Sequence, residues 1–281
     1  MNRHSRPSFR RHLIAVLLIV VTHAGLAQSQ SQWTDKAYAY LEQDSLPQAE
    51  ECFRRAIEAS PTSTSSAMLL ANLGTVQQRR GKVREAIASY TSALERSPMN
   101  ASILMSRAVA YMSSGNDDKA YTDLCNVLDG NINHAEALYY RAFIYTSRRE
   151  YATARADYKR LLAIDPSHAN GLFGLAILDQ REGRLQAAEQ QLSQLIERYP
   201  DNATYWQARA NVLSELQLYD LALLDLESAI ALQPTDAYIY VARAELYLKT
   251  KRRTAAQQDL DHAAALGLSR AALSELYEQC K

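Results

Sequence analysis

The side chains that most often carry out catalysis or hold metal ions are few in this sequence and stand far apart. After residue 27, the histidines and cysteines form neither an H-E-x-x-H motif nor a Cys/His spacing suited to a metal ion. The sequence also contains no glycine-rich phosphate loop and no G-x-S-x-G turn. It therefore predicts a protein that is not an enzyme and that uses no metal, cofactor or small-molecule substrate. The residues concerned are His134, His168, His262, Cys52, Cys125 and Cys280.

Arg141 raises a different question, because it interrupts the apolar stretch YYRAFIY at residues 139–145. A guanidinium that is buried among aromatic side chains without a partner would be costly. Either a carboxylate from elsewhere in the chain lies close to Arg141, or the arginine faces a ligand. Deciding between these alternatives requires knowing which elements position Arg141.

Small residues recur along the chain at a regular spacing. One series of alanines begins at Ala49, and after a first step of 37 residues every step is 34 residues. A second series, of alanine or glycine, lies 12 residues before the first, and in five cases a proline lies 12 residues after it. The three series are Ala49, Ala86, Ala120, Ala154, Ala188, Ala222 and Ala256; Ala37, Gly74, Ala108, Ala142, Ala176, Ala210 and Ala244; and Pro61, Pro98, Pro166, Pro200 and Pro234.

This spacing predicts a hairpin of two helices in every repeat. Apolar residues at i, i+3, i+4 and i+7 give each helix one face that can be buried. A small residue on each helix allows the two backbones to cross closely. The proline then ends the second helix and redirects the chain. The low content of glycine and proline, 9 and 7 residues, also favours helix throughout.

The repeat resembles the tetratricopeptide repeat, a 34-residue helix–turn–helix unit with preferred residues at fixed offsets. The stretch WTDKAYAYLEQDSLPQAEECFRRAIEASP matches that pattern best, whereas Ile132 and Leu268 stand where two of the units would have proline. The resemblance implies an all-α, right-handed superhelical solenoid of stacked units with a capping helix at residues 269–281, for which Ser269 is the expected N-cap. The units are expected at residues 30–63, 67–100, 101–134, 135–168, 169–202, 203–236 and 237–268.

The repeats offer a partner for Arg141. If the small residue of each first helix is numbered position 8, arginine at position 7 occurs in the same four repeats as aspartate at position 23. Pairing within repeats would satisfy all four arginines, whereas pairing between neighbours would satisfy two. We therefore expect within-repeat ion pairs; arginines that line a ligand groove are the alternative. The pairs are Arg107–Asp123, Arg141–Asp157, Arg209–Asp225 and Arg243–Asp259.

The resemblance also implies a binding face. In this family the first helices line a concave surface, on which positions 2, 5, 9, 12 and 13 point inward. In the third to fifth repeats the side chains carried over in this way are apolar, whereas those of the last two repeats are more polar. The apolar set predicts a site for a peptide or a helix; packing between neighbouring first helices is the alternative. Its members are Met105, Val109, Met112, Tyr139, Phe143, Phe173 and Ile177.

The N-terminus has the features of a secretory signal peptide. Four arginines precede the apolar run Leu13–Val21, and small residues then lead to Ala27. The run is shorter than the roughly 20 residues that span a bilayer. We expect cleavage after Ala27 and export to the periplasm or outer envelope, with residues 28–268 forming the repeats. An uncleaved signal-anchor, through which alone the protein would contact the membrane, is the alternative.

These observations together predict a non-catalytic protein that binds other proteins. The net charge is zero, so the sequence shows no basic footprint for nucleic acid. The expected function is a scaffold or adaptor of the periplasm or cell envelope that holds a protein or peptide partner in the groove of the repeats. A structural module that associates with itself is the competing function.

Overall fold

The structure is a computed structural model that describes residues 29–61, 63 and 65–281. The expected signal segment, residues 1–27, lies outside these residues. All regular secondary structure in the described part is helical, with residues 29–42 helical before the first labelled helix. The labelled helices are α2 (Leu46–Ala59), α3 (Ser66–Arg79), α4 (Val83–Arg96), α5 (Ala101–Ser113), α6 (Asp117–Gly130), α7 (Ala135–Ser147), α8 (Tyr151–Ile164), α9 (Ala169–Arg181), α10 (Leu185–Arg198), α11 (Ala203–Glu215), α12 (Tyr219–Leu232), α13 (Ala237–Lys249), α14 (Arg253–Ala265) and α15 (Ser274–Gln279).

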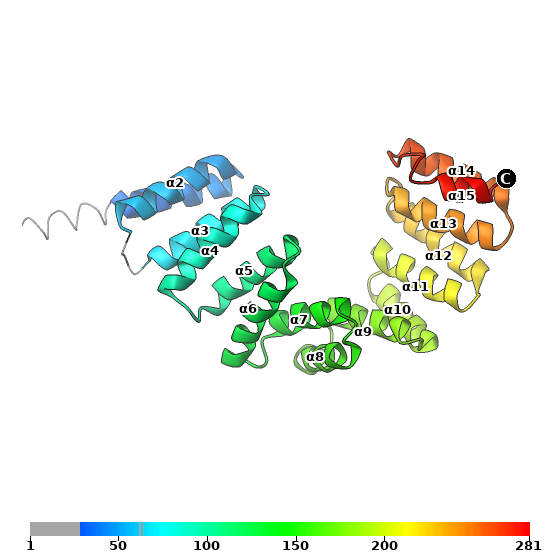
Figure 1. Ribbon diagram of the computed structural model, residues 1–281, viewed down its shortest axis with the longest axis horizontal. Helices are drawn as coiled ribbons and strands as arrows, with labels where there is room; N and C mark the ends of the chain where they lie inside the picture. Colours follow the sequence, from blue (N-terminus) through cyan, green and yellow to red (C-terminus); the bar gives the residue numbers. More distant parts are fainter. Residues whose placement is uncertain (1–28, 62, 64) are drawn as a thin grey trace, which may run out of the picture. The chain divides into compact units, whose positions relative to one another are not determined.

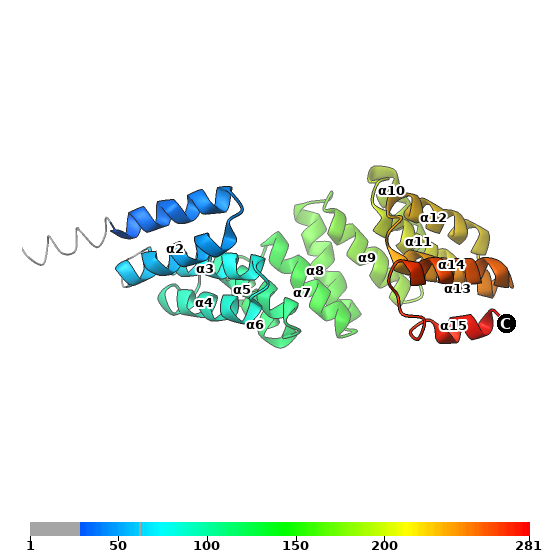
Figure 2. The same cartoon turned by 90° about the horizontal axis from the view of Figure 1, so that it is seen from above.

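The helices form two compact bodies. The first body contains the described residues up to Ala137, and the second contains Leu138–Lys281. Within each body consecutive helices pack as stacked hairpins, so that α3 contacts α4 and α5, and α11 contacts α10 and α12 (Figures 1 and 2). First helices of neighbouring repeats also contact one another, as in the pairs α3·α5 and α9·α11. The expected all-helical repeat fold is therefore present.

The small residues lie where the two helices of each hairpin cross. All of the alanines and the glycine in the two series are buried. A Cβ atom added to Gly74 would lie 2.8 Å from Cε1 of Tyr90, a distance too short for any real contact. The spacing of small residues therefore reflects close helix crossing, and the large apolar residues beside them fill the core.

The second helices end at a fixed distance from the prolines. Helix α8, for example, ends at Ile164, two residues before Pro166, and α12 ends at Leu232, two residues before Pro234. Helix α6 ends at Gly130 although Ile132 replaces the proline. Proline therefore reinforces a stop that the hairpin geometry already imposes.

Each hairpin turn contains one residue with a left-handed backbone. The φ angles at this site lie between 55° and 76°. The residue that follows donates its N–H to the carbonyl five residues earlier, as Arg184 does to Asp179 at 2.8 Å and Leu218 does to Leu213 at 2.9 Å. This is the hydrogen bond of a Schellman motif, in which glycine is favoured because it has no Cβ. The left-handed residues are Asp44, Gly81, Gly115, Arg149, Gly183, Gln217 and Lys251.

We expect the turn residue to have a measurable effect on stability. Gly183→Ala should lower the free energy of unfolding by about 1 kcal/mol, because a Cβ is disfavoured in the left-handed region. A Cβ there would meet no neighbour within 4 Å, so the effect would come from the backbone alone. Gln217→Gly should stabilise by up to about 0.5 kcal/mol, since the relief is partly offset by the chain entropy of glycine. Urea unfolding measures both; stabilisation by Gly183→Ala would contradict this explanation.

The C-terminal segment caps the second body but is less helical than expected. Helix α15 begins at Ser274, and residues 270–273 form turns. Ser269 is therefore not the N-cap of a helix through residue 281, although its Oγ accepts a hydrogen bond from the N–H of Ala272 at 3.2 Å. Leu273 is buried against the cluster that contains Leu260 and Tyr240. Burial of Leu273 favours turns over a continuous helix at residues 270–273. The segment thereby covers the apolar face of the last hairpin, formed by α13 and α14.

Candidate functional site

Each of the four arginines at position 7 contacts the aspartate of its own repeat. In every pair Nε and Nη2 of the arginine donate to the two carboxylate oxygens at 2.7–2.9 Å, so that each contact is bidentate. All four aspartates are buried. The pairs therefore lie between the two helices of a hairpin, and the arginines do not line the groove described below. This geometry answers the question raised by Arg141.

The pairs are reinforced by further hydrogen bonds and by the protein environment. Nη1 of Arg209 also donates to Oγ of Ser193 in the preceding repeat, at 2.9 Å. The hydrogen bonds to Asp225 raise the pKa of Arg209, although burial acts in the opposite direction. Bidentate charge-assisted hydrogen bonds fix geometry as well as charge. The pairs consequently hold the two helices of a hairpin in register.

Two repeats that lack the arginine and aspartate contain a different buried network. Glu50, on α2, contacts Arg54 at 2.7 Å, Lys82 at 3.4 Å and also Arg80. In the fifth repeat, Asp179 is the buried carboxylate. Both networks join neighbouring repeats. In the first, Glu50 belongs to the first repeat, whereas Arg80 and Lys82 belong to the second. These networks are not evident from the sequence, since no single pair of residue types recurs at the positions of their members.

Asp179 accepts hydrogen bonds from two repeats. Nη2 of Arg155, from the preceding repeat, lies 2.7 Å from it, and Arg184 and Gln191 of its own repeat lie 2.8 Å and 2.7 Å away. Burial raises the pKa of Asp179, but the hydrogen bonds from Arg184, Arg155 and Gln191 outweigh it and hold the pKa below its ordinary value. Arg155 also contacts Glu182.

The charges of the two networks are inverted. At position 21 the first network has Glu50 and the second has Arg155; at position 14 the first has Arg80 and the second has Glu182. An ion pair therefore occupies the same place between two repeats with its signs exchanged. Such a reversal favours the native neighbour over another repeat, because like charges would meet in a mismatched stack.

The predicted apolar face is divided between the two bodies. Met105, Val109 and Met112 lie on α5 of the first body. Met105 is only 6% exposed, so its side chain belongs to the core and is not available as a binding surface. The expectation for Met105 is wrong because its flexible thioether fills space between packed helices. Val109 and Met112 are partly buried.

The remaining four apolar residues lie in the second body, and three of them pack against neighbouring side chains. The ring of Phe173 lies 5.2 Å from that of Tyr205 in the next repeat. The ring of Tyr139 lies 5.9 Å from that of His168, at the end of the same repeat. Ile177 packs against the same buried cluster as Phe173. Phe143 is the exception, because 50% of it is exposed. Of the four, Phe143 offers the most apolar surface to a partner.

Binding and folding can be separated at these positions. We expect Phe143→Ala to weaken partner capture by about 1–3 kcal/mol if the apolar face binds, with little loss of stability because half of the side chain is exposed. Phe173→Ala should cost more stability than Phe143→Ala, since its ring contacts Tyr205. Leu138→Ala, a fully buried control, should cost about 2–5 kcal/mol of stability. Capture and thermal melting would be measured on the same variants; if Phe143→Ala loses capture only in proportion to unfolding, the apolar face is not a binding site.

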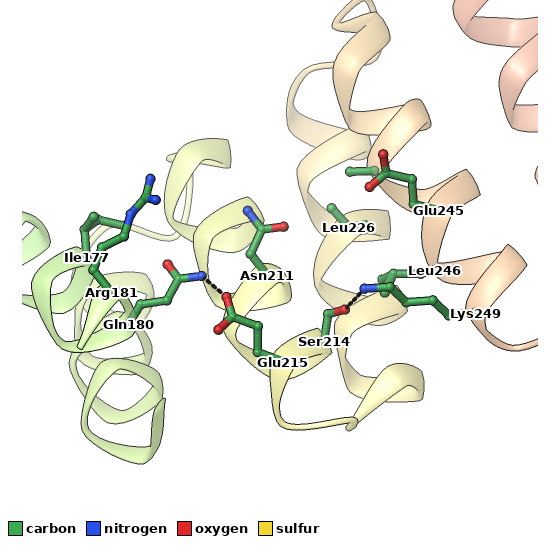
Figure 3. Close-up of a pocket in the computed structure, with 11 residues that line it drawn as sticks. Ile177, Gln180, Arg181, Asn211, Ser214, Glu215, Leu226, Glu245, Leu246 and Lys249 are labelled. Carbon is green, nitrogen blue, oxygen red and sulfur yellow. Dashed lines mark hydrogen bonds between the residues drawn. The ribbon is translucent and has the colours of Figure 1, made fainter. Parts of the chain in front are cut away.

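A polar groove crosses three first helices of the second body (Figure 3). Its volume is about 610 Å³, and α9, α11 and α13 provide most of its walls. The side chains that line it are Ile177, Gln180, Arg181, Asn211, Ser214, Glu215, Leu226, Ala242, Glu245, Leu246 and Lys249. Asn211, Ser214, Glu215 and Glu245 belong to the polar part of the first-helix face that the sequence indicated, whereas the hollow itself is a result of the tertiary structure.

Hydrogen bonds organise one side of this groove. Nε2 of Gln180 donates to Oε1 of Glu215 in the next repeat, and Nζ of Lys249 donates to Oγ of Ser214 at 3.0 Å (Figure 3). These bonds connect α9 to α11 and α11 to α13. The charged groups that line the groove are two cations, Arg181 and Lys249, and two anions, Glu215 and Glu245. Together with the uncharged hydrogen-bonding groups, they make the groove better suited to a polar ligand than to a hydrocarbon.

Neither metal chemistry nor a membrane span is indicated in the described part of the chain. No group of three or more His, Cys, Asp or Glu side chains there could hold a metal ion. Among the same residues, no helix is both long enough and apolar enough to cross a membrane. What the described site offers chemically is hydrogen bonding and charge.

The fold and the groove together define an all-helical repeat protein with a polar groove on its first helices, and comparisons with known proteins identify the family. Tetratricopeptide repeat models match residues 27–98, 71–133 and 145–212. A solved tetratricopeptide repeat protein from Parabacteroides merdae is 30% identical, with a TM-score of 0.78 over 90% of this chain and 99% of that chain. This chain therefore belongs to the tetratricopeptide repeat family. The search of curated proteins gave no match.

Two more distant structures share the fold. A chain of the APC/C hetero-tetramer Cut9-Hcn1 is 15% identical, with a TM-score of 0.68 over 100% of this chain and 61% of that one. YrrB, described as a tetratricopeptide repeat protein with an unusual peptide-binding site, is 20% identical, with a TM-score of 0.54 over 73% of this chain and 100% of its own. At these identities the likeness concerns the fold alone.

Proposed function

We propose that this protein is a non-catalytic scaffold of the periplasm or cell envelope that binds a protein partner through the groove on α9, α11 and α13. The observation that carries the proposal is the groove itself, with its volume of about 610 Å³ and its lining from three successive repeats. Tetratricopeptide repeats present such surfaces to protein partners, and YrrB is a member of the family with a peptide-binding site. The proposed location rests on the signal-peptide pattern that ends at Ala27.

The groove has the properties expected of a peptide site. Exposed amide, hydroxyl and charged groups can satisfy the backbone and side chains of a bound segment, and water can fill the remaining space. The partly exposed Ile177 adds an apolar contact on the α9 side. A surface that spans three repeats would take several residues of an unfolded segment or a loop, since each repeat contributes a few side chains.

Site-specific crosslinking in cells tests this proposal. A photo-crosslinking amino acid at Asn211, in the groove, should capture the partner after export of the full-length chain. The same amino acid at Glu197, an exposed residue of α10 that does not line the groove, is the matched control. Capture at both sites or at neither would count against the groove. N-terminal sequencing of the exported protein would decide whether the chain begins at Gln28.

Self-association is a second candidate function, favoured by an exposed leucine face. Leu218, Leu221 and Leu224 are all exposed around the first turns of α12. The equivalent positions of the other six repeats hold polar residues or alanine. Such a face could pair with a second copy of the chain. Measurement of mass against concentration separates the functions, because a self-associating module would form oligomers that Leu221→Ser disrupts, whereas a scaffold would stay monomeric without its partner.

A further inference from the structure

Three groups in the groove of the second body have no partner, and they come from three successive first helices. Arg181 on α9, Asn211 on α11 and Glu245 on α13 are exposed, and within the described part of the chain their side chains form no hydrogen bond or ion pair. Figure 3 shows the guanidinium, the amide and the carboxylate on the same side of the groove, across from the bonded pairs of Gln180 with Glu215 and Ser214 with Lys249. A cation, an amide and an anion therefore face the groove in order.

The spacing of these groups corresponds to a short extended peptide. Packed helices lie about 8–10 Å apart, so two steps from α9 to α13 cover roughly 16–20 Å. An extended chain advances about 3.3 Å per residue, and this distance corresponds to about five or six residues. A ligand that reaches both charged groups would therefore carry its own charges about that far apart.

Asn211 favours an extended segment over a helical one. Its side chain has both a donor and an acceptor, which together match the C=O and N–H of a peptide unit. A peptide in a helix already uses these groups internally, whereas an extended peptide leaves them free. Because Asn211 lies between Arg181 and Glu245, it would contact the middle of a segment whose two ends meet the charges.

The groove selects by the position of charge and not by its total. Arg181 and Lys249 balance Glu215 and Glu245 among the lining residues. Lys249 and Glu215 are held by Ser214 and Gln180, which leaves Arg181 and Glu245 as the charges that a ligand can satisfy. A ligand that is uniformly acidic or uniformly basic would be attracted at one end and repelled at the other.

We propose that the groove on α9, α11 and α13 binds an extended peptide segment with an acidic side chain at Arg181 and a basic side chain at Glu245, about five or six residues apart. This inference rests on the proposed function and specifies the partner of the same site. It defines the ligand as a segment of mixed charge, in contrast to the single-sign ligands that a net-charged groove would take.

Three synthetic peptides test the inference on the protein that comprises residues 28–281. Each is an acetylated, amidated and fluorescently labelled nonapeptide of Gly, Ser and Thr with charges at its second and eighth positions. One carries Glu and Lys, one carries two Glu, and one carries two Lys. The wild-type protein should bind the mixed peptide roughly five- to tenfold more tightly than either of the others, by fluorescence anisotropy at low salt. The preference should shrink as salt is added.

Charge-reversal variants make the test specific to the two residues. Arg181→Glu should shift the preference to the double-Lys peptide, and Glu245→Arg should shift it to the double-Glu peptide. Glu197→Arg on α10 and Arg253→Glu on α14 change exposed charges outside the groove, and they should leave the ranking unchanged. Circular dichroism of every variant would show that the repeats remain folded.

The inference is overturned if the wild type binds none of the peptides or all three equally, or if the ranking does not follow the two substitutions. These failures can be told apart from failure of the proposed function. Capture of a partner by a crosslinker at Asn211, without the predicted peptide ranking, would leave the scaffold function standing and remove only the mixed-charge ligand.

Discussion

Asp157→Ala should lower the free energy of unfolding by about 3 kcal/mol, because it leaves the guanidinium of Arg141 between two helices without its carboxylate. This value is at the lower end of the range for broken buried pairs, since one fifth of the Arg141 side chain is exposed and water can reach it. A surface ion pair would cost only about 0–1 kcal/mol. Urea unfolding, with the slope checked for two-state behaviour, measures the difference.

A double variant determines whether the loss comes from the unpaired charge. Arg141→Leu combined with Asp157→Ala removes both partners and should recover most of the stability, because an apolar pair can replace a buried ion pair at little cost. Alanine is preferred to serine at position 157. In the second repeat, Ser89 has Gln77 as its partner at 2.7 Å, whereas the fourth repeat has Tyr145 at the position of Gln77. If the double variant is as unstable as the sum of the single variants, the pairing explanation fails.

Asp179→Ala is expected to produce the second large loss of stability, about 2–4 kcal/mol. The substitution removes the common acceptor of Arg155, Arg184 and Gln191, and so weakens the contact between the fourth and fifth repeats. The loss should be smaller than for a fully enclosed network because 46% of the Arg184 side chain is exposed and can turn to water. Hydrogen exchange should show faster opening in α8 and α9 than in α13 and α14, which a uniform loss of stability would not produce.

The pH dependence gives this prediction an independent signature. The pKa of Asp179 is lowered in the folded state, as is that of Glu50, where burial acts upward but the contacts with Arg54, Arg80 and Lys82 outweigh it. Each carboxylate therefore contributes stability above its unfolded pKa of about 4 and loses it as the pH falls through the lower folded value. Asp179→Asn should make the acid side of the stability profile less steep. An unchanged slope would show that Asp179 does not titrate in this way.

Much of the architecture follows from the order of residues alone. The 34-residue spacing of alanines and prolines predicts the hairpins, because a close crossing tolerates only small side chains and proline cannot continue a helix. The co-occurrence of arginine and aspartate at positions 7 and 23 predicts which groups pair, since buried charges need partners. The sequence predicts the left-handed turn position in only three repeats, where it is glycine: Gly81, Gly115 and Gly183. In the other repeats a non-glycine residue takes the same backbone conformation.

The sequence by itself determined the repeat, its helices and the partners of the four arginines, because these depend on contacts at fixed separations within one unit. The tertiary structure alone decided which exposed positions are free to bind. Met105 and Phe143 both sit on the predicted face, yet one is buried and the other is half exposed. The networks around Glu50 and Asp179 and the groove between Arg181 and Glu245 join side chains of different repeats. Their geometry depends on how neighbouring hairpins stack, and no regular spacing in the chain records that.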